Sequence, residues 1–237
     1  MALPLNVTPS YQLEVPSTGQ RVNYRPFLIK EEKTLLIAQQ SEDPKVMVES
    51  LKEVIKSCIK DDINIDSLAL FDLEYIFTQI RAKSVGEVVE LVFPCDTCTD
   101  EKAKTKVTID LTKIQVVKSE DHQTTIPLFG EVGVMMKYPN MDTLQKLESL
   151  DVTDFNTIFS VVAESIDAIY NNEEVFYSKD QTKEELLEFL GNLTSEQFGK
   201  VQKFFETMPK MKQDVEYKCP VCGKEHKKTL EGLQSFF

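Results

Sequence analysis

The chain has 237 residues, a formal net charge of −12 and a hydrophobic content of 41%. This length can bury a core in one large domain or two small ones, and no apolar run reaches the roughly 18 residues of a membrane-spanning helix. The acidic balance disfavours binding to nucleic acid phosphates and to anionic membranes. The first residues lack a basic start and an apolar stretch, so secretion is not expected. Five cysteines in such a chain favour metal binding or free thiols over a disulfide framework.

The first predicted segment, residues 1–30, combines an arm with a hairpin. Residues 1–10 lack a periodic pattern, whereas the alternating runs 11–15 and 21–25 flank the turn sequence PSTG, which predicts two paired strands. An arm and hairpin of this kind could equally pair with the sheet edge of a partner. The sequence leaves that alternative open.

The second predicted segment, residues 31–138, begins with helices over about 31–40, 44–59 and 68–83. Cys58 lies in an apolar stripe with helical spacing, so we expect a buried thiol rather than a reactive nucleophile. The third helix is apolar around most of its surface but carries two carboxylates, Asp72 and Glu74. We expect them to be solvated on a narrow polar strip or to form a hydrogen bond with a neighbouring element. A small antiparallel sheet is predicted from strand-like runs over 88–93, 107–111, 114–117, 124–128 and 131–137.

The third predicted segment, residues 139–237, is expected to be mainly helical. Helices are predicted over about 141–150 and 154–170, and two more follow capping boxes that start at Thr182 and Thr194. The best candidate for a domain boundary is the loop over 118–123, although we expect the three segments to form one compact unit. The predicted fold class is α+β, with helical bundle-like segments and a small antiparallel sheet.

Two C-x-x-C pairs, Cys95 with Cys98 and Cys219 with Cys222, each lie between strand-like runs, as in a zinc knuckle. One knuckle supplies two ligands and a closed structural zinc site needs four, so we predict that all four cysteines bind one zinc. About 120 residues separate the pairs, against roughly 15–20 in an ordinary ribbon, which makes this a split zinc-ribbon-like site. The C-terminal pair is the more specific one, because Gly223 permits a positive φ after the second ligand.

Two other interpretations of the cysteines stay open, a redox C-x-x-C and ordinary thiols. A redox pair normally begins a helix in a βαβ context, and strand-like residues follow both pairs here. His226 could replace one of the zinc ligands, but we expect a solvated side chain at this strand edge. No nucleophile-elbow, zinc-protease or phosphate-loop motif occurs in the sequence. The residues therefore predict a non-enzymatic interaction protein with a structural zinc.

Three stretches carry a resemblance to a known family: LFDLEYIFTQIRAKSVGE at 70–87, FLGNLTSEQF at 189–198, and FFETMP at 204–209 running on to CPVCG at 219–223. They resemble the baseplate hub subunit or hub assembly protein family of T-even-type contractile-tailed bacteriophages. The resemblance implies a structural or assembly role in the central hub of the viral tail baseplate. It implies a location in the virion and, during assembly, in the host cytoplasm.

The partners that this resemblance implies are other hub and tail proteins, the tape measure protein among them, and further copies of the chain. Candidate contact surfaces are an apolar helix face around Phe204 and the tail Phe236-Phe237, although packing within the chain is the favoured expectation for both. The alternative functions are a zinc-ribbon nucleic-acid-binding regulator and, less favoured, a C-x-x-C thiol-disulfide protein.

Overall fold

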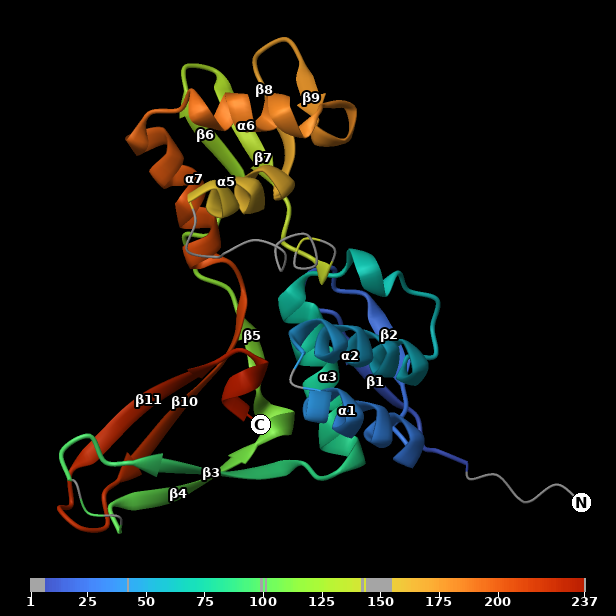
Figure 1. Cartoon of the computed structure of the whole chain (residues 1–237), viewed down its shortest axis with the longest axis vertical. Helices are drawn as coiled ribbons and strands as arrows, with labels where there is room; N and C mark the ends of the chain where they lie inside the picture. Colours follow the sequence, from blue (N-terminus) through green and yellow to red (C-terminus); the bar gives the residue numbers. More distant parts are fainter. Residues whose placement is uncertain are drawn as a thin grey trace, which may run out of the picture. The chain divides into compact units, whose positions relative to one another are not determined.

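The computed structural model describes residues 7–41, 43–98, 100, 102–141, 143 and 155–236. The chain divides into two compact units (Figure 1): unit 1 consists of Met1–Ile65, Phe71–Val117 and Lys210–Phe237, and unit 2 of Asp66–Leu70 and Lys118–Pro209. The main part of unit 2 begins at the loop over 118–123, which the sequence indicates as a boundary. The fold is α+β, as predicted, with helices and small antiparallel sheets. The arrangement of the three predicted segments as one compact unit stays a prediction.

Unit 1 begins with the predicted hairpin of β1 (Tyr11–Glu14) and β2 (Arg21–Tyr24). The predicted helices follow as α1 (Ile29–Ser41), α2 (Pro44–Cys58) and α3 (Leu70–Ser84). Most residues of α3 are buried, as expected for a helix that is apolar around most of its circumference and lies at the centre of its domain.

Asp72, in the first turn of α3, is fully buried. It accepts a hydrogen bond from the backbone N–H of Ser17 at 2.9 Å and a second one from the Ser17 hydroxyl. A buried carboxylate needs such partners, and its place at a helix N-terminus is electrostatically favourable. The predicted bond to a neighbouring element is thus confirmed, and it connects the turn of the β1–β2 hairpin with α3.

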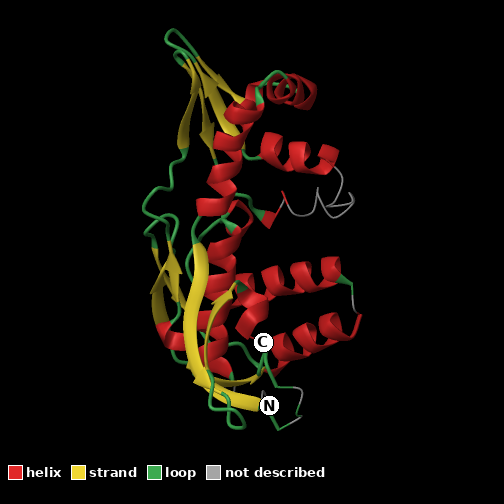
Figure 2. Ribbon diagram, turned by 90° about the vertical axis from the view of Figure 1, so that its left-hand side faces the viewer, coloured by secondary structure: helices red, strands yellow, loops and turns green. Residues whose placement is uncertain are grey.

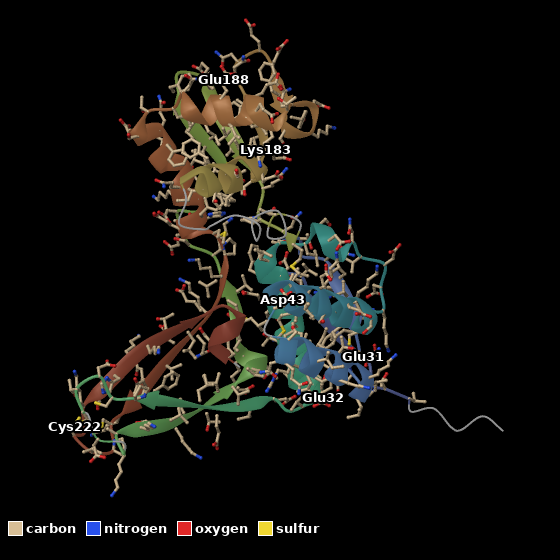
Figure 3. The ribbon with its side chains drawn as sticks, viewed as in Figure 1. Glu31, Glu32, Asp43, Lys183, Glu188 and Cys222 are labelled. Carbon is tan, nitrogen blue, oxygen red and sulfur yellow. The ribbon has the colours of Figure 1, made fainter. Side chains whose placement is uncertain are left out.

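Glu31, at the start of α1, is a second buried carboxylate that is held by hydrogen bonds, and the residue is 6% exposed (Figure 3). Its carboxylate accepts hydrogen bonds from the N–H of Leu28 at 2.7 Å and from the guanidinium of Arg25 at 2.9 Å. Burial opposes ionisation, but the Arg25 hydrogen bond and charge and the Leu28 N–H together lower the pKa of Glu31 from 4.5 to about 2. The ionised form is therefore the one that stabilises the fold.

We expect this carboxylate to make unit 1 acid-sensitive. Because the pKa of Glu31 is lower in the folded chain than in the unfolded one, its stabilisation is complete above its ordinary pKa of 4.5 and is lost as the pH falls towards about 2. Glu31→Gln should remove about 2–3 kcal/mol of this pH-dependent stability, measured by urea unfolding at pH 7 and pH 3. The matched control is Glu32→Gln, one position along the helix, which should retain the wild-type pH dependence. Equal pH dependence in Glu31→Gln and the wild type would contradict the expectation.

The remainder of unit 1 is built from two antiparallel sheets. One is the hairpin of β3 (Val88–Pro94) and β4 (Lys104–Asp110). The other has the order β11-β10-β5 and is made of β5 (Gln115–Val117), β10 (Lys210–Lys218) and β11 (Glu225–Glu231). Since β5 pairs with β10, the C-terminal strands of the chain return to the unit that contains its N-terminus.

The core under these sheets includes the C-terminal 3-10 turn, Leu233–Phe236. Phe236 is fully buried there, so its expected packing within the chain is confirmed. Phe237 lies outside the described residues. The buried residues of this core are Ala82, Val89, Phe93, Ile109, Leu111, Ile114, Met211, Val215, Leu230 and Phe236.

Unit 2 contains a four-stranded antiparallel sheet of order β6-β7-β8-β9. Its strands are β6 (Thr125–Phe129), β7 (Val132–Met136), β8 (Ile166–Tyr170) and β9 (Val175–Tyr177). Three helices that the structure describes in this unit, α5 (Phe155–Glu164), α6 (Lys183–Gly191) and α7 (Ser195–Thr207), lie on one side of the sheet (Figure 2).

Both predicted capping boxes are confirmed in unit 2. Thr182 caps α6 together with Glu185, and Thr194 caps α7 together with Gln197. The apolar face of α7 packs within the unit, because Val201 and Phe204 are buried in its core while Phe198 and Phe205 pack against that core. This face is thus part of the core, as expected for packing within the chain.

The predicted helix over 154–170 is wrong in its second half. α5 ends at Glu164, and β8 follows it and pairs with β7. Buried Ile166 and Ala168 flank exposed Asp167, a period of two that belongs to a strand. The predicted helix over 141–150 falls on residues that the structure does not describe, apart from 141 and 143.

Candidate metal centre

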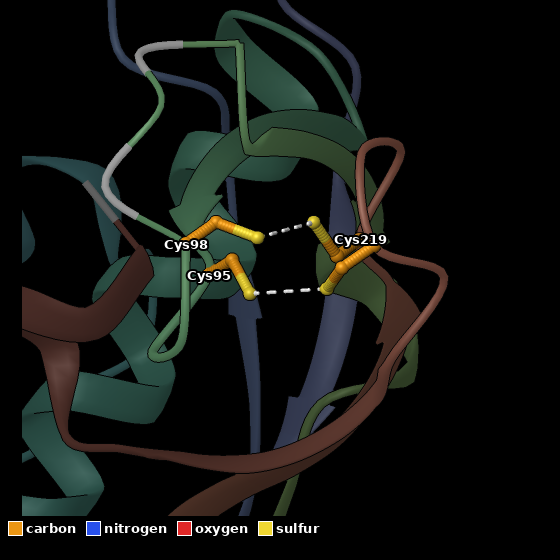
Figure 4. Close-up of side chains that lie close together, drawn as sticks. Cys95, Cys98 and Cys219 are labelled. Atoms are coloured by element: carbon orange, nitrogen blue, oxygen red, sulfur yellow. Dashed lines mark hydrogen bonds between the residues drawn. The ribbon is translucent and has the colours of Figure 1, made fainter.

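Two hairpins of unit 1 bring the four paired cysteines together (Figure 4). Cys95 directly follows β3, and Cys98 lies in the connection to β4. Cys219 directly follows β10, and Cys222 lies in the turn before β11. Each pair is therefore presented by the tip of a hairpin, as the sequence predicts for two knuckles.

Local hydrogen bonds fix both tips. The N–H of Cys95 donates to the carbonyl oxygen of Ala103, and the N–H of Cys219 donates to that of Lys224, each at 2.8 Å. Gly223 has φ of 74°, a conformation that glycine adopts without steric cost, and its N–H donates to the Cys219 carbonyl at 3.0 Å. The glycine of the CPVCG motif is thus required by the turn that places Cys222.

The four sulfurs have the spacing of a tetrahedral ligand set. The Sγ atoms of Cys95 and Cys222 are 3.8 Å apart, and those of Cys98 and Cys219 are 4.0 Å apart. All four lie within 4.8 Å of one another. Zinc–sulfur bonds of about 2.3 Å in a tetrahedron put the sulfurs about 3.8 Å apart. The residues fit zinc, and all four cysteines are free of disulfides.

The surroundings of the thiols shift their pKa values in opposite directions. Hydrogen bonds from the hydroxyl and the N–H of Thr97 lower the pKa of Cys95 to about 5, and the N–H of Lys224 lowers that of Cys222. Cys98 donates to Cys222, which raises the pKa of Cys98 to about 12. Four adjacent thiols do not all ionise by themselves, whereas a divalent cation supplies the charge that stabilises four thiolates.

His226 lies beside the cysteines and is 8% exposed, so the expectation of a solvated side chain is wrong. Its Nε2 atom is 3.3 Å from the sulfur of Cys95, and its Nδ1 atom is 3.4 Å from the carboxylate of Asp96. The ring stacks on Tyr217, its direct partner in the β10–β11 register. The alternation of side chains along a strand could have predicted the burial of His226. His226 lies four residues before Leu230 and therefore on the same face of β11, and these two are the buried residues of that strand.

Further contacts join the two hairpins next to the cysteines. The hydroxyl of Thr105 donates to the carbonyl of Lys218 at 3.0 Å, and the hydroxyl of Tyr217 donates to that of Pro94 at 3.4 Å. The rings of Phe93 and Tyr217 stack with centroids 5.2 Å apart. These contacts hold the cysteine pairs opposite each other.

The fifth cysteine, Cys58, lies apart from this cluster at the end of α2 and is fully buried. Burial raises the pKa of its thiol, which lowers the thiolate fraction needed for reactivity. The expected burial of Cys58 is confirmed.

The chain belongs to the T4 bacteriophage base plate protein family, whose model matches residues 8–237. Within that class it is similar to the baseplate hub assembly protein gp26 of Enterobacteria phage T4, with 26% identity over 228 residues. The alignment covers 96% of this chain and 97% of the relative. The resemblance expected from the sequence is confirmed, and it extends to the N-terminal hairpin. No solved structure matches the chain, and no helix among the described residues is long and apolar enough to cross a membrane.

Proposed function

We propose that this chain is a structural or assembly protein of the central hub of a phage tail baseplate, acting through protein–protein contacts. The observation that carries this proposal is the alignment with a hub assembly protein along almost the whole length of both chains. Its partners are other hub and tail proteins, including the tape measure protein, and further copies of itself. Its location is the tail baseplate of the virion and, during assembly, the host cytoplasm.

Within this role the four cysteines bind one structural zinc as thiolates. The supporting observation is the pair of cross-hairpin sulfur distances, 3.8 and 4.0 Å, which match a tetrahedral site. Four protein ligands leave no open position for water or substrate, so the site is structural rather than catalytic. The metal connects two hairpins whose cysteines lie as much as 127 residues apart in the chain.

A zinc clasp at this place would give the hairpins a fixed shape. Figure 3 places Cys222 at the end of the hairpins, away from the helix that carries Glu31 and Glu32. Among the described residues, the hydrophobic cluster at this end has three buried members, Cys95, Ala103 and Cys219, with Cys98 packed against it. Three small buried residues provide little hydrophobic stabilisation, whereas metal binding supplies folding free energy directly.

The hub role is tested in cells that produce the phage. A tagged copy of the full chain, isolated from infected cells, should carry baseplate hub and tail proteins with it, identified by mass spectrometry. A stop codon in its gene should leave tails without complete baseplates in electron micrographs. The control is an acidic tagged protein of similar size and charge, which should enrich none of these proteins. Absence of tail proteins in the isolate, together with normal tails from the stop-codon phage, would overturn the proposal.

A further inference from the structure

The imidazole of His226 joins the two cysteine-bearing hairpins from outside the set of four sulfurs. It belongs to β11, whereas both groups that its ring nitrogens face belong to the connection that follows β3. Nε2 lies 3.3 Å from the sulfur of Cys95, and Nδ1 lies 3.4 Å from the carboxylate of Asp96. Four sulfurs complete a tetrahedral zinc site, so this ring contacts a ligand without taking a ligand position.

The ring of His226 is held in place by both hairpins. It is buried, and it stacks on Tyr217 of β10 with centroids 5.0 Å apart and an angle of 16° between the planes. Tyr217 in turn stacks on Phe93 of β3 at 5.2 Å. A buried polar ring needs hydrogen-bond partners, and the sulfur of Cys95 is such a partner inside the cluster. The stacking therefore keeps Nε2 directed at Cys95.

Four thiolates around one zinc carry surplus negative charge. A divalent cation with four thiolates has a net charge of −2, which hydrogen bonds donated to the sulfurs stabilise. Backbone groups supply some of these bonds, since the N–H of Val221 donates to Cys219 at 3.4 Å and the N–H of Lys224 donates to Cys222. These two donors lie in the same hairpin as their acceptors. The contact of His226 differs, because ring and sulfur belong to different hairpins.

We propose that His226 is a positioning residue for the zinc site: its Nε2–H donates a hydrogen bond to the Cys95 thiolate and fixes the direction in which this sulfur faces the metal. Outer hydrogen-bond partners orient metal ligands, and their loss typically costs about 10–100-fold in metal affinity. The bond also aligns the two hairpins, since it joins β11 to the first cysteine pair. This inference rests on the proposed zinc binding and adds one residue to the four cysteines.

Two variants at this position separate hydrogen bonding from packing. In His226→Phe a ring still stacks on Tyr217 but no donor faces Cys95, so zinc affinity should fall about 10–100-fold. In His226→Gln the amide nitrogen lies as many bonds from Cα as Nε2 does and still donates, so most of the affinity should be retained. Competition between the full chain and a chromophoric chelator for Zn²⁺, at one fixed pH, measures both. The matched control is His122→Phe in unit 2, which should bind zinc as the wild type does.

Two kinds of spectra report on the bond itself. Long-range ¹H–¹⁵N spectra of the zinc-loaded wild type should show a proton on Nε2 of His226. With Co²⁺ in place of zinc, the wild type and His226→Phe should both have the visible bands of a four-thiolate site, because His226 is not a ligand. The sulfur-to-cobalt charge-transfer band of the variant should move to lower energy, since the Cys95 sulfur has lost a donor. A role in packing alone would leave that band in place.

An Nε2 atom without a proton would overturn the inference, as would a cobalt spectrum of three sulfurs and one nitrogen in the wild type. So would wild-type zinc affinity in His226→Phe, or a loss in His226→Gln as large as that in His226→Phe. Circular dichroism verifies the fold of each variant, and the wild-type spectra need no substitution. A wild type unable to bind zinc would overturn the clasp as well, whereas the other outcomes leave the clasp and the hub proposal standing.

Discussion

Cys98→Ser and Cys222→Ser should each release zinc from the chain, and to the same extent. The wild type should hold about one zinc, and each variant should retain much less, because each removes one of four ligands from a single site. Structural zinc sites in small peptides have apparent binding free energies of about 10–16 kcal/mol, and this energy contributes to folding. We therefore expect each variant to unfold at a clearly lower temperature than the zinc-loaded wild type. Metal analysis of the purified proteins and thermal unfolding with and without a chelator measure both effects.

The control for this experiment is the fifth cysteine. Cys58→Ala removes a thiol that lies outside the cluster, so zinc content should stay at about one per chain, even if the loss of a buried side chain lowers stability. Release of zinc from Cys222→Ser but not from Cys98→Ser would show that the first pair is not a ligand pair. A wild type purified without any zinc, and unable to bind it afterwards, would refute the clasp altogether.

The two knuckles illustrate how far local sequence patterns lead. A C-x-x-C between strand-like runs is a local motif. Each motif supplies two ligands, and a closed zinc site needs four, so two such motifs in one chain predict a shared site. The meeting of the pairs depends on tertiary structure, namely the pairing of β5 with β10 and the contacts of Tyr217 and Thr105 across the hairpins. The sequence could therefore predict which cysteines lie close together. It could not predict the strand pairing and the cross-hairpin contacts that bring them together, because these join residues far apart in the chain.

Capping boxes were predictable for the same reason, because the bonds of Thr182 and Thr194 lie within four consecutive residues. β8 was missed because its apolar residues continue the helical spacing of α5, and only pairing with β7 selects the strand. The burial of His226 was missed because its environment comes partly from Asp96 and Cys95, which are distant in sequence. Tertiary contacts thus determine both the strand β8 and the burial of His226, whereas the capping boxes depend on local contacts.

Phe236→Ala should lower the free energy of unfolding of unit 1 by about 3–5 kcal/mol, the usual cost of removing a fully buried phenylalanine. Its ring lies in the core with Leu111, Ile114 and Met211. The turn that carries it is held in place, since the N–H of Gly232 donates to the carbonyl of Met211 at 3.0 Å. Little relaxation can therefore fill the cavity. Guanidinium unfolding followed by circular dichroism measures the loss.

Phe129→Ala is the matched control, because it removes the same atoms from a side chain that is 45% exposed. It should cost less than about 1.5 kcal/mol. Equal losses in the two variants would contradict the assignment of Phe236 to the core. A large loss confined to Phe236 would also argue against this residue as a docking point, since a ring that stabilises its own chain is not free to contact a partner.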